Sequence, residues 1–315
     1  MPDIILSDRD FKDEWRAKIA ATAPGYQFAT VTEDLDWSSV TITIGWSKAW
    51  TEKLLQPDSR LKWVQSISAG VDTLPLDLFR EKQILLSNTS GIHARSIAEH
   101  VLAAILMETR GFTRSIKNQQ QEQWSSKNLS FSYLNERKIL IVGTGHIGRK
   151  LAALLQALGV EPWGINTSGH PAAGFTKTYS LDQLPEISGQ ADFVINILPL
   201  TKETSHLYDS RFFEAMNPAG TFINVGRGAS VDTQALITAL QTGQIRQGIL
   251  DVFEEEPLPQ GNPLWQMENC IITPHISGMT PHFQKAFMEI FLKNLTHFTA
   301  SGQLAQNQVS LTDGY

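Results

Sequence analysis

Short apolar runs alternate with segments of helical periodicity over residues 1–100. Continuous apolar runs of this kind are typical of strands that are buried on both faces of a parallel sheet. Between them, residues 8–20 and 47–55 space their apolar side chains as one face of an amphipathic helix does. The pattern predicts an α/β layered domain whose strands include Ile4–Leu6, Val40–Ile44, Trp63–Ile67 and Ile84–Leu86.

A longer apolar helix is predicted after these strands. Ser96 and Glu99 have the spacing of a capping box, which places the start of the helix at Ser96. Gly111 is a typical residue for its end. Because apolar side chains occur nearly all round this helix, we expect it to be buried on several sides. Residues 118–132 are polar and turn-rich apart from Trp124, and we expect an exposed segment there.

The alternation of strands and helices begins again at Lys138. Its apolar runs predict a second parallel sheet of about six strands. We place these strands at Lys138–Val142, Glu161–Ile165, Phe193–Leu198, Thr221–Val225, Gln247–Val252 and Cys270–Ile272. A last amphipathic helix is predicted over residues 282–302, and we expect it to return to the first domain.

A glycine-rich turn follows the first strand of this second sheet. Gly143, Gly145 and Gly148 form the pattern G-x-G-x-x-G, and a helix is predicted directly after it, over Ile147–Leu158. In this context the second glycine lets the backbone approach a pyrophosphate, and the N-terminus of the helix favours the phosphate charge. The turn therefore predicts a dinucleotide-binding site.

Asn166 stands where NAD-binding folds usually carry an acid, at the end of the next strand. Without a carboxylate, both the acceptor for the ribose hydroxyls and the repulsion against a 2′-phosphate are lost. Asn166, Thr167 and Ser168 are able to donate hydrogen bonds to a phosphate, and His170 can add partial positive charge. We therefore expect NADP(H) to be preferred. No arginine that would bind the 2′-phosphate follows, so we expect NAD(H) to be accepted as well.

Composition narrows the class of protein. The chain has 315 residues, 42% of them hydrophobic, which suits two domains with sizeable cores. A net charge of −6 with mixed signs argues against nucleic acid or an anionic membrane as partner. No apolar stretch reaches the roughly 18 residues of a spanning helix, and the N-terminal segment lacks the pattern of a signal peptide. We expect a soluble cytoplasmic protein.

Metal and disulfide chemistry are not expected. Cys270 is the single cysteine, so no internal disulfide can form, and its apolar neighbours suggest an inert, buried thiol. His93 and His100 are seven residues apart with no third ligand nearby in the sequence. We therefore expect no metal site.

Four motifs make the chain resemble the D-isomer-specific 2-hydroxyacid dehydrogenases, in particular their glyoxylate/hydroxypyruvate reductase-like members. They are SISAGVD at 66–72, GTGHIG at 143–148, NVGRGASVD at 224–232, and LDVFEEEPLP with TPHISG at 250–259 and 273–278. The resemblance covers essentially the whole chain. It implies two Rossmann-like domains with parallel sheets and a cleft between them, one flavodoxin-like and one dinucleotide-binding. It also implies a homodimer.

The resemblance further implies a division of the chain and a reaction. Residues 1–96 with 284–315 would form the substrate domain, and residues 97–283 the dinucleotide-binding domain. The reaction would be NAD(P)H-dependent reduction of a small 2-oxo acid to a D-2-hydroxy acid. Hydride comes from the nicotinamide, so the protein must supply a proton and a cation for the carboxylate.

Three residues would do this chemistry in the family. Arg227 would grip the carboxylate with its forked guanidinium and polarise the ketone. His275 would donate the proton, and Glu256 would orient the ring and stabilise the imidazolium. Formate dehydrogenases of this fold carry glutamine in place of that glutamate, because they transfer no proton. Glu254 and Glu255 are expected to be solvated neighbours without a role.

The remaining expected site residues bind substrate and cofactor. The backbone N–H groups of Ser68, Ala69, Gly70 and Val71 would hold the substrate carboxylate. Asp251 would contact the nicotinamide carboxamide, and Pro199 would line the cofactor site. The full cofactor set is Gly143, Gly145, His146, Ile147, Gly148, Asn166, Thr167, Ser168, Leu198, Pro199, Thr204, Val225, Gly226, Asp251 and Gly278.

The alternative is a non-catalytic, nicotinamide-sensing protein of the same fold, like the C-terminal-binding corepressors. Those proteins recruit peptide motifs and carry disordered tails. This chain has no low-complexity segment and keeps Arg227, Glu256 and His275, so an enzyme is favoured. Substrate specificity depends on loops such as Ser68–Asp72 and Gly91–Ala94, whose sequence leaves glyoxylate, hydroxypyruvate, pyruvate and bulkier 2-oxo acids open as substrates.

Overall fold

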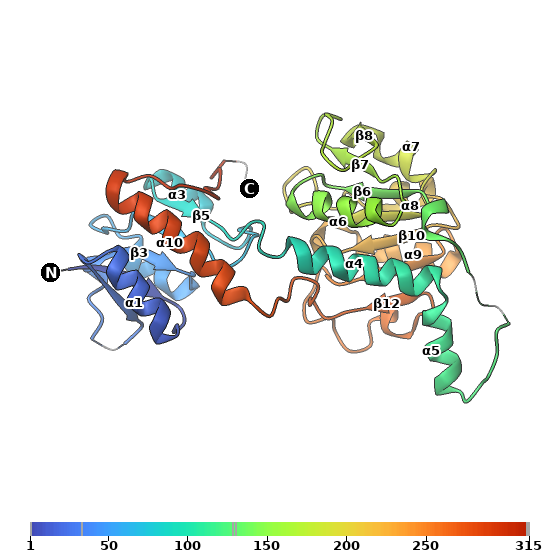
Figure 1. Ribbon diagram of the computed structural model, residues 1–315, viewed down its shortest axis with the longest axis horizontal. Coiled ribbons are helices and arrows are strands. Elements are labelled where there is room, and N and C mark those ends of the chain that lie inside the picture. Colours follow the sequence, from blue (N-terminus) through green and yellow to red (C-terminus); the bar gives the residue numbers. More distant parts are fainter. Residues whose placement is uncertain (1, 33, 128, 130, 313–315) are drawn as a thin grey trace. The chain divides into compact units, whose positions relative to one another are not determined.

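The computed structural model describes residues 2–32, 34–127, 129 and 131–312. The chain divides into two compact units, Met1–Ile92 with Thr280–Tyr315, and His93–Met279 (Figure 1). The chain thus passes from one unit to the other at 92–93 and 279–280, against expected boundaries at 96–97 and 283–284. Each unit is described by itself.

The first unit is built on a five-stranded parallel sheet in the order β2-β1-β3-β4-β5. Four of its strands were predicted and one was missed. The missed strand, β2, lies at the edge of the sheet, where its side chains are only partly buried, so it has no continuous apolar run. The strands are β1 (Asp3–Ser7), β2 (Tyr26–Thr30), β3 (Val40–Ile44), β4 (Trp63–Gln65) and β5 (Leu85–Ser87).

Helices cover both faces of this sheet. On one face lie α1 (Asp13–Thr22) and α10 (Phe283–Ser301), the last helix, which returns to the first unit as predicted. Phe291 of α10 stacks on the fully buried Trp63 of β4 with ring centroids 5.3 Å apart. On the other face lie α2 (Thr51–Leu54) and α3 (Leu76–Glu81). Burying each large apolar side chain contributes roughly 1.5–3 kcal/mol, so these aromatic contacts hold α10 to the unit.

The second unit is built on a seven-stranded parallel sheet in the order β12-β11-β10-β9-β6-β7-β8. The six predicted strands are present, and the seventh, β8, is again a partly exposed edge strand of polar sequence. The strands are β6 (Ile139–Val142), β7 (Trp163–Asn166), β8 (Lys177–Ser180), β9 (Phe193–Asn196), β10 (Thr221–Asn224), β11 (Gln247–Leu250) and β12 (Cys270–Ile272).

Two layers of helices enclose the second sheet. Side chains on successive strand positions point to opposite faces, so Leu140 and Ile141 of β6 belong to different apolar clusters. One cluster includes α4 (Ala94–Thr109) and α6 (His146–Ala157), and the other includes α7 (Leu184–Ser188), α8 (Ser210–Ala215) and α9 (Thr233–Thr242). The parallel sheets and their helical layers confirm the predicted α/β fold.

The helix that opens the second unit differs from its prediction at one end. The capping box at Ser96 and Glu99 is wrong, because α4 already begins at Ala94 and Glu99 accepts a hydrogen bond from Arg95 instead. At the other end the prediction is confirmed, since Gly111 follows α4 with a left-handed φ of 69°.

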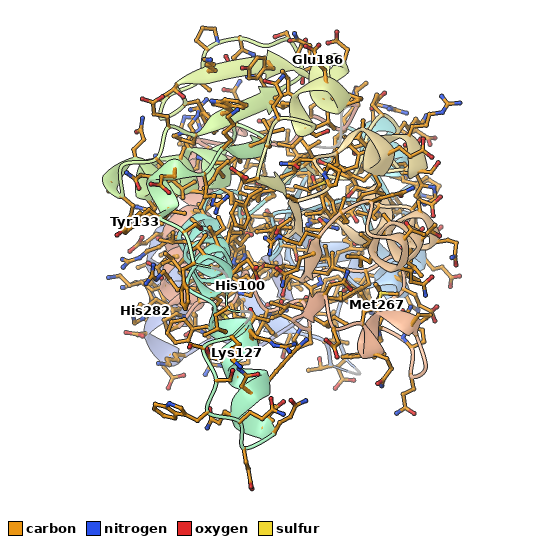
Figure 2. The ribbon with its side chains drawn as sticks, turned by 90° about the vertical axis from the view of Figure 1, so that its right-hand side faces the viewer. His100, Lys127, Tyr133, Glu186, Met267 and His282 are labelled. Carbon is orange, nitrogen blue, oxygen red and sulfur yellow. The ribbon has the colours of Figure 1, made fainter. Side chains whose placement is uncertain are left out.

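A second helix, α5 (Phe112–Gln120), follows Gly111 and includes the first residues of the predicted exposed segment. The chain then runs through an extended loop that contains Lys127 (Figures 1 and 2). Trp124 is fully exposed there, as expected, while positions 128 and 130 lie outside the described residues. Within the described part of the chain, no helix combines the length and the apolar character needed to cross a membrane.

One row of paired residues crosses the second sheet near the carboxyl ends of its strands. The row consists of Ile165, Val142, Asn196, Asn224, Leu250 and Ile272. Ligands of open α/β sheets bind beyond this edge, where the chain leaves each strand. The expected site residues of this unit follow the row within a few positions and therefore share one edge of the sheet.

Candidate active site

The three glycines of the turn after β6 are required for different reasons. Gly143 has a φ of +115°, which strains any other residue, and a Cβ on Gly148 would lie 2.0 Å from the carbonyl oxygen of Gly143. Gly145 has an ordinary φ of −77°, and a Cβ there would meet no atom within 4 Å. The fold thus demands the first and third glycines, whereas the open space at Gly145, beside the N-terminus of α6, fits a close-lying phosphate group.

Asn166, at the end of β7, is buried, and its side chain is hydrogen-bonded both to the glycine turn and to its own loop. Its amide nitrogen donates to Thr144 Oγ1 at 3.3 Å and to the carbonyl oxygen of His170 at 2.8 Å. Its Oδ1 accepts from the N–H of Ser168 at 3.3 Å. Thr167, Ser168 and His170 are exposed at this edge. The exposed donors for a phosphate are therefore the neighbours of Asn166 rather than its own amide.

The segment after β9 is held by buried polar side chains. Asn196 Oδ1 accepts from the N–H of Leu198 at 3.0 Å. The hydroxyl of Thr204 donates to the carbonyl oxygen of Pro199 at 2.7 Å and accepts from the N–H of Thr201 at 2.7 Å. Thr204, which was expected among the cofactor-binding residues, therefore also fixes the loop that contains Pro199.

Arg227 lies between two glycines that the backbone requires. A Cβ on Gly226 would lie 2.8 Å from the carbonyl oxygen of Leu198, and one on Gly228 would lie 1.9 Å from the carbonyl carbon of Phe253. The half-buried Arg227 donates from Nη1 to the carbonyl oxygen of Gly226 at 2.8 Å. The close contacts of the two glycines bring the segment after β10 against its neighbours after β9 and β11.

His275 and Glu256 form a direct pair. Nδ1 of His275 lies 2.7 Å from Oε2 of Glu256, and the other carboxylate oxygen accepts from the N–H of Phe253 at 2.9 Å. Because a carboxylate only accepts, Nδ1 is the donor, and Nε2 is the ring nitrogen left to exchange a proton. His275 also has a φ of +53°, a conformation that is uncommon outside glycine and is often found at functional sites.

Asp251 holds the loop that carries His275. Its buried carboxylate accepts from Thr273 Oγ1 at 2.5 Å, from the N–H of Ile276 at 3.0 Å and from the N–H of Ser277 at 2.9 Å. Burial raises the pKa of Asp251, but the hydrogen bonds from Ser277 and its neighbours outweigh it and bring the pKa below its usual value. Asp251, expected to contact nicotinamide, is thus bonded to the loop of the catalytic candidate.

Two contacts that hold the 273–278 segment, one through Thr273 and one through His93, were not predicted from the sequence. Thr273 joins Asp251 to His100 of α4, whose Nε2 lies 3.4 Å from the hydroxyl. His93, at the start of α4, lies with Nδ1 2.7 Å from the carbonyl oxygen of Gly278. Both histidines therefore contact the 273–278 segment. A polar residue directly after an apolar strand, as Thr273 follows β12, is the signal that could have identified the first of these contacts.

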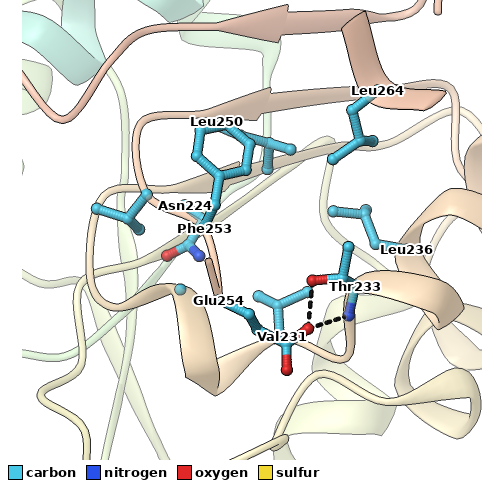
Figure 3. A pocket seen from close by; sticks show the side chains of 10 residues that line it. Asn224, Val231, Thr233, Leu236, Leu250, Phe253, Glu254 and Leu264 are labelled. Atoms are coloured by element: carbon cyan, nitrogen blue, oxygen red, sulfur yellow. Dashed lines mark hydrogen bonds between the residues drawn. The ribbon is translucent and has the colours of Figure 1, made fainter. Parts of the chain in front are cut away.

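Glu254 is exposed, as we expected, but its carboxylate has hydrogen-bond partners that we did not predict. Its carboxylate lies 2.7 Å from His206 Nε2 and accepts from both the N–H and the hydroxyl of Thr233 at the start of α9 (Figure 3). Burial raises the pKa of Glu254, but the hydrogen bonds from Thr233 and His206 outweigh it, so the pKa falls below its usual value. Glu254 ties the segment before Glu256 to α9, whereas Glu255 is exposed as expected.

In the first unit, the loop of residues 68–71 follows β4. The carbonyl oxygens of Ser68 and Ala69 accept from the N–H of Thr89 at 3.3 Å and the amide of Asn88 at 2.8 Å. In a trans peptide the N–H points opposite to the C=O, so the N–H groups of Ala69 and Gly70 point away from these two donors. The loop thus offers N–H groups of the kind that bind anions. Asn88 and Thr89 were not singled out in the sequence.

Among the described residues, no group of three or more His, Cys, Asp and Glu side chains is placed to hold a metal ion. Burial raises the pKa of Cys270 to about 12, which keeps the thiol protonated and unreactive.

Comparison with known proteins identifies the family. The model of the D-isomer specific 2-hydroxyacid dehydrogenase NAD binding domain matches residues 102–277. Glyoxylate/hydroxypyruvate reductase B of Escherichia fergusonii is 34% identical over 241 residues, which cover 75% of this chain and 74% of the relative.

Two solved structures resemble nearly the whole chain. Phosphoglycerate dehydrogenase from Lactobacillus plantarum is 40% identical with a TM-score of 0.59, covering 98% of this chain and 100% of its own. An NADPH-dependent glyoxylate/hydroxypyruvate reductase from Sinorhizobium meliloti is 25% identical with a TM-score of 0.84, covering 99% of this chain and 100% of its own. The protein belongs to the D-isomer specific 2-hydroxyacid dehydrogenase family and is an oxidoreductase.

Proposed function

We propose that this enzyme reduces a small 2-oxo acid to a D-2-hydroxy acid, with NADPH preferred over NADH. The observation that carries the proposal is the His275–Glu256 pair, 2.7 Å apart, on the sheet edge that also holds Arg227 and the glycine turn. The reductases named among the relatives and similar structures act on glyoxylate and hydroxypyruvate, which are small 2-oxo acids. These two acids are therefore our first candidates for the substrate.

The side chains have separate tasks in this proposal. Bound nicotinamide supplies the hydride. Arg227 binds the substrate carboxylate and polarises the ketone, while His275 donates a proton from Nε2 to the ketone oxygen. Glu256 holds the ring and stabilises its protonated form. In the first unit, we assign carboxylate binding to the N–H groups of Ala69, Gly70 and Val71, because the N–H of Ser68, also expected to bind it, donates to Ser66 Oγ at 3.1 Å.

The remaining residues would hold the cofactor. We assign the pyrophosphate to the turn of Gly143, Gly145 and Gly148 with the first residues of α6, His146 and Ile147. Beyond the adjacent strands, the segments that contain Pro199 and Gly226 would line the site for the rest of the dinucleotide. The open space at Gly145, beside the N-terminus of α6, supports the assignment of the pyrophosphate.

The direct test is a panel of 2-oxo acids assayed with both cofactors. We expect oxidation of NADPH on addition of glyoxylate or hydroxypyruvate. Chiral chromatography of the glycerate formed from hydroxypyruvate should show the D configuration. A chain that binds NADPH but turns over none of the acids with either cofactor would favour the nicotinamide-sensing alternative.

Replacing Asn166 by aspartate is expected to lower the ratio of kcat/KM for NADPH to that for NADH. The new carboxylate repels a 2′-phosphate and offers an acceptor to the ribose hydroxyls. A similar structure whose protein is described as NADPH-dependent supports the wild-type preference. Steady-state kinetics with both cofactors measure the ratio.

The two cofactors serve as each other's control, because Asn166 also ties its loop to Thr144 and His170. Loss of loop order alone would weaken both cofactors equally and leave the ratio unchanged. Either that outcome or an NADH-selective wild-type enzyme would contradict the proposed preference.

We also propose that a second copy of the chain covers the surface around α5. Phe112 and Ile116 of α5 and Trp124, Phe131 and Tyr133 of the following loop are large apolar or aromatic side chains that are exposed. Exposed apolar groups of this kind are typical of interaction surfaces. We expect light scattering to give the mass of a dimer, and Phe112→Asp with Ile116→Asp to give a monomer. A wild-type monomer at working concentrations would refute this.

A further inference from the structure

A pair of buried asparagine side chains joins the segments after β9 and β10. Asn196 and Asn224 end these neighbouring strands and are paired in register, and they are only 0% and 1% exposed. Burying an amide is costly unless its hydrogen bonds are made. The two amides are hydrogen-bonded to each other, since Asn196 Nδ2 donates to Asn224 Oδ1 at 2.9 Å.

The orientation of the first amide is fixed by its partners. Asn196 Oδ1 accepts from the N–H of Leu198 and from the hydroxyl of Tyr208, each at 3.0 Å. Burial raises the pKa of Tyr208 well above its ordinary value, so its hydroxyl remains a donor over the working pH range. Asn196 Nδ2 must therefore face Asn224 and Ser230, to whose Oγ it donates at 2.8 Å.

The bonds continue from this pair to the backbone of Arg227. Asn224 Oδ1 accepts from the N–H of Gly226 at 3.1 Å, and its Nδ2 donates to the carbonyl oxygen of Arg227 at 3.2 Å. Ser230 Oγ donates to the same carbonyl at 2.6 Å. The backbone of Arg227 is thus anchored on both sides to one buried network of Asn196, Asn224, Ser230 and Tyr208.

We propose that this network positions Arg227 for substrate and fixes it relative to the segment that contains Leu198 and Pro199. The proposal rests on the function proposed above. Stability alone does not require such a network, because apolar side chains of similar volume avoid the cost of burying polar groups. A fully satisfied polar network instead specifies one geometry, which a substrate-binding guanidinium needs. The four residues are positioning residues that act through Arg227.

The test compares two buried serines of the second unit. Ser230→Ala removes the hydroxyl that bonds to Arg227, and Ser188→Ala removes one that donates to the carbonyl oxygen of Pro185 at 2.8 Å, outside the site. Both serines are fully buried, so we expect each variant to lower Tm by a few degrees, with the larger fall for Ser230→Ala because Ser230 Oγ also accepts from Asn196 Nδ2. Only Ser230→Ala should lower kcat/KM for the preferred 2-oxo acid, by about tenfold. Binding of NADPH should change less than about twofold, since its phosphates do not depend on Arg227.

A double-mutant cycle separates positioning from a general loss of structure. If Ser230 acts through Arg227, the effect of Ser230→Ala on kcat/KM should shrink below about twofold in an Arg227→Lys background. Tyr208→Phe, which leaves no large cavity, should lower kcat/KM in the same way but to a smaller extent.

The outcomes distinguish the inference from the proposed function. Equal effects of Ser230→Ala in both backgrounds, or equal kcat/KM for the Ser230→Ala and Ser188→Ala enzymes, would overturn the positioning role alone. A wild-type chain that reduces no 2-oxo acid would overturn the proposed function and the inference together.

Discussion

Arg227→Lys is expected to lower kcat/KM for 2-oxo acid reduction by about 10²-fold or more. Lysine keeps the positive charge but loses the planar fork that binds a carboxylate through two parallel hydrogen bonds. The loss should appear in both KM and kcat, because the same group is proposed to bind the carboxylate and polarise the ketone. Steady-state kinetics with glyoxylate or hydroxypyruvate and saturating NADPH measure it.

Arg246→Lys is the matched control for this substitution. Arg246 stands just before β11, at the opposite end of the strands from Arg227, and donates to Glu108, Thr221 and the carbonyl oxygen of Ala219. It should lose some stability and keep its kcat/KM. If Arg227→Lys retained near-normal activity, Arg227 would not be the substrate anchor.

His275→Gln is expected to lower kcat for reduction by about 10²- to 10⁴-fold, because the general acid is lost. The subtler variant Glu256→Gln keeps a hydrogen-bond acceptor but removes the negative charge that stabilises the protonated ring. Reduction needs the protonated ring, so activity is present at low pH and lost as the pH rises. With the protonated ring destabilised, the alkaline limb of the profile should move to lower pH.

Glu255→Gln serves as the control for the pH profile. Glu255 is the exposed neighbour of Glu256, and its substitution removes the same charge from the same segment. Its alkaline limb should stay where it is in the wild-type enzyme. An unmoved limb in an active Glu256→Gln enzyme would show that the pair seen at 2.7 Å does not control proton donation.

Patterns within a few residues were enough to predict most of the fold. A strand buried on both faces is mostly apolar, so β6 could be read from a continuous apolar run, and β3 and β9 from runs interrupted only by Thr41, Thr43 and Asn196. The turn of Gly143, Gly145 and Gly148 was equally readable, because its constraints lie within one turn and the start of one helix. The edge strands β2 and β8 were missed because one side of each is left partly open to solvent.

Tertiary structure decided how the candidate site is supported. Asn196 and Asn224 are ordinary polar residues in the sequence, and their bonds, like those of Asp251 to the 273–277 segment, form only when strands from distant parts of the chain come into register. Glu254 is likewise bound by Thr233 and His206, which lie 21 and 48 residues away. The sequence alone therefore determined which strands and turns form, through periodicity and backbone freedom. The packed sheet determined which buried polar groups meet, because a hydrogen bond depends on distance in space rather than separation along the chain.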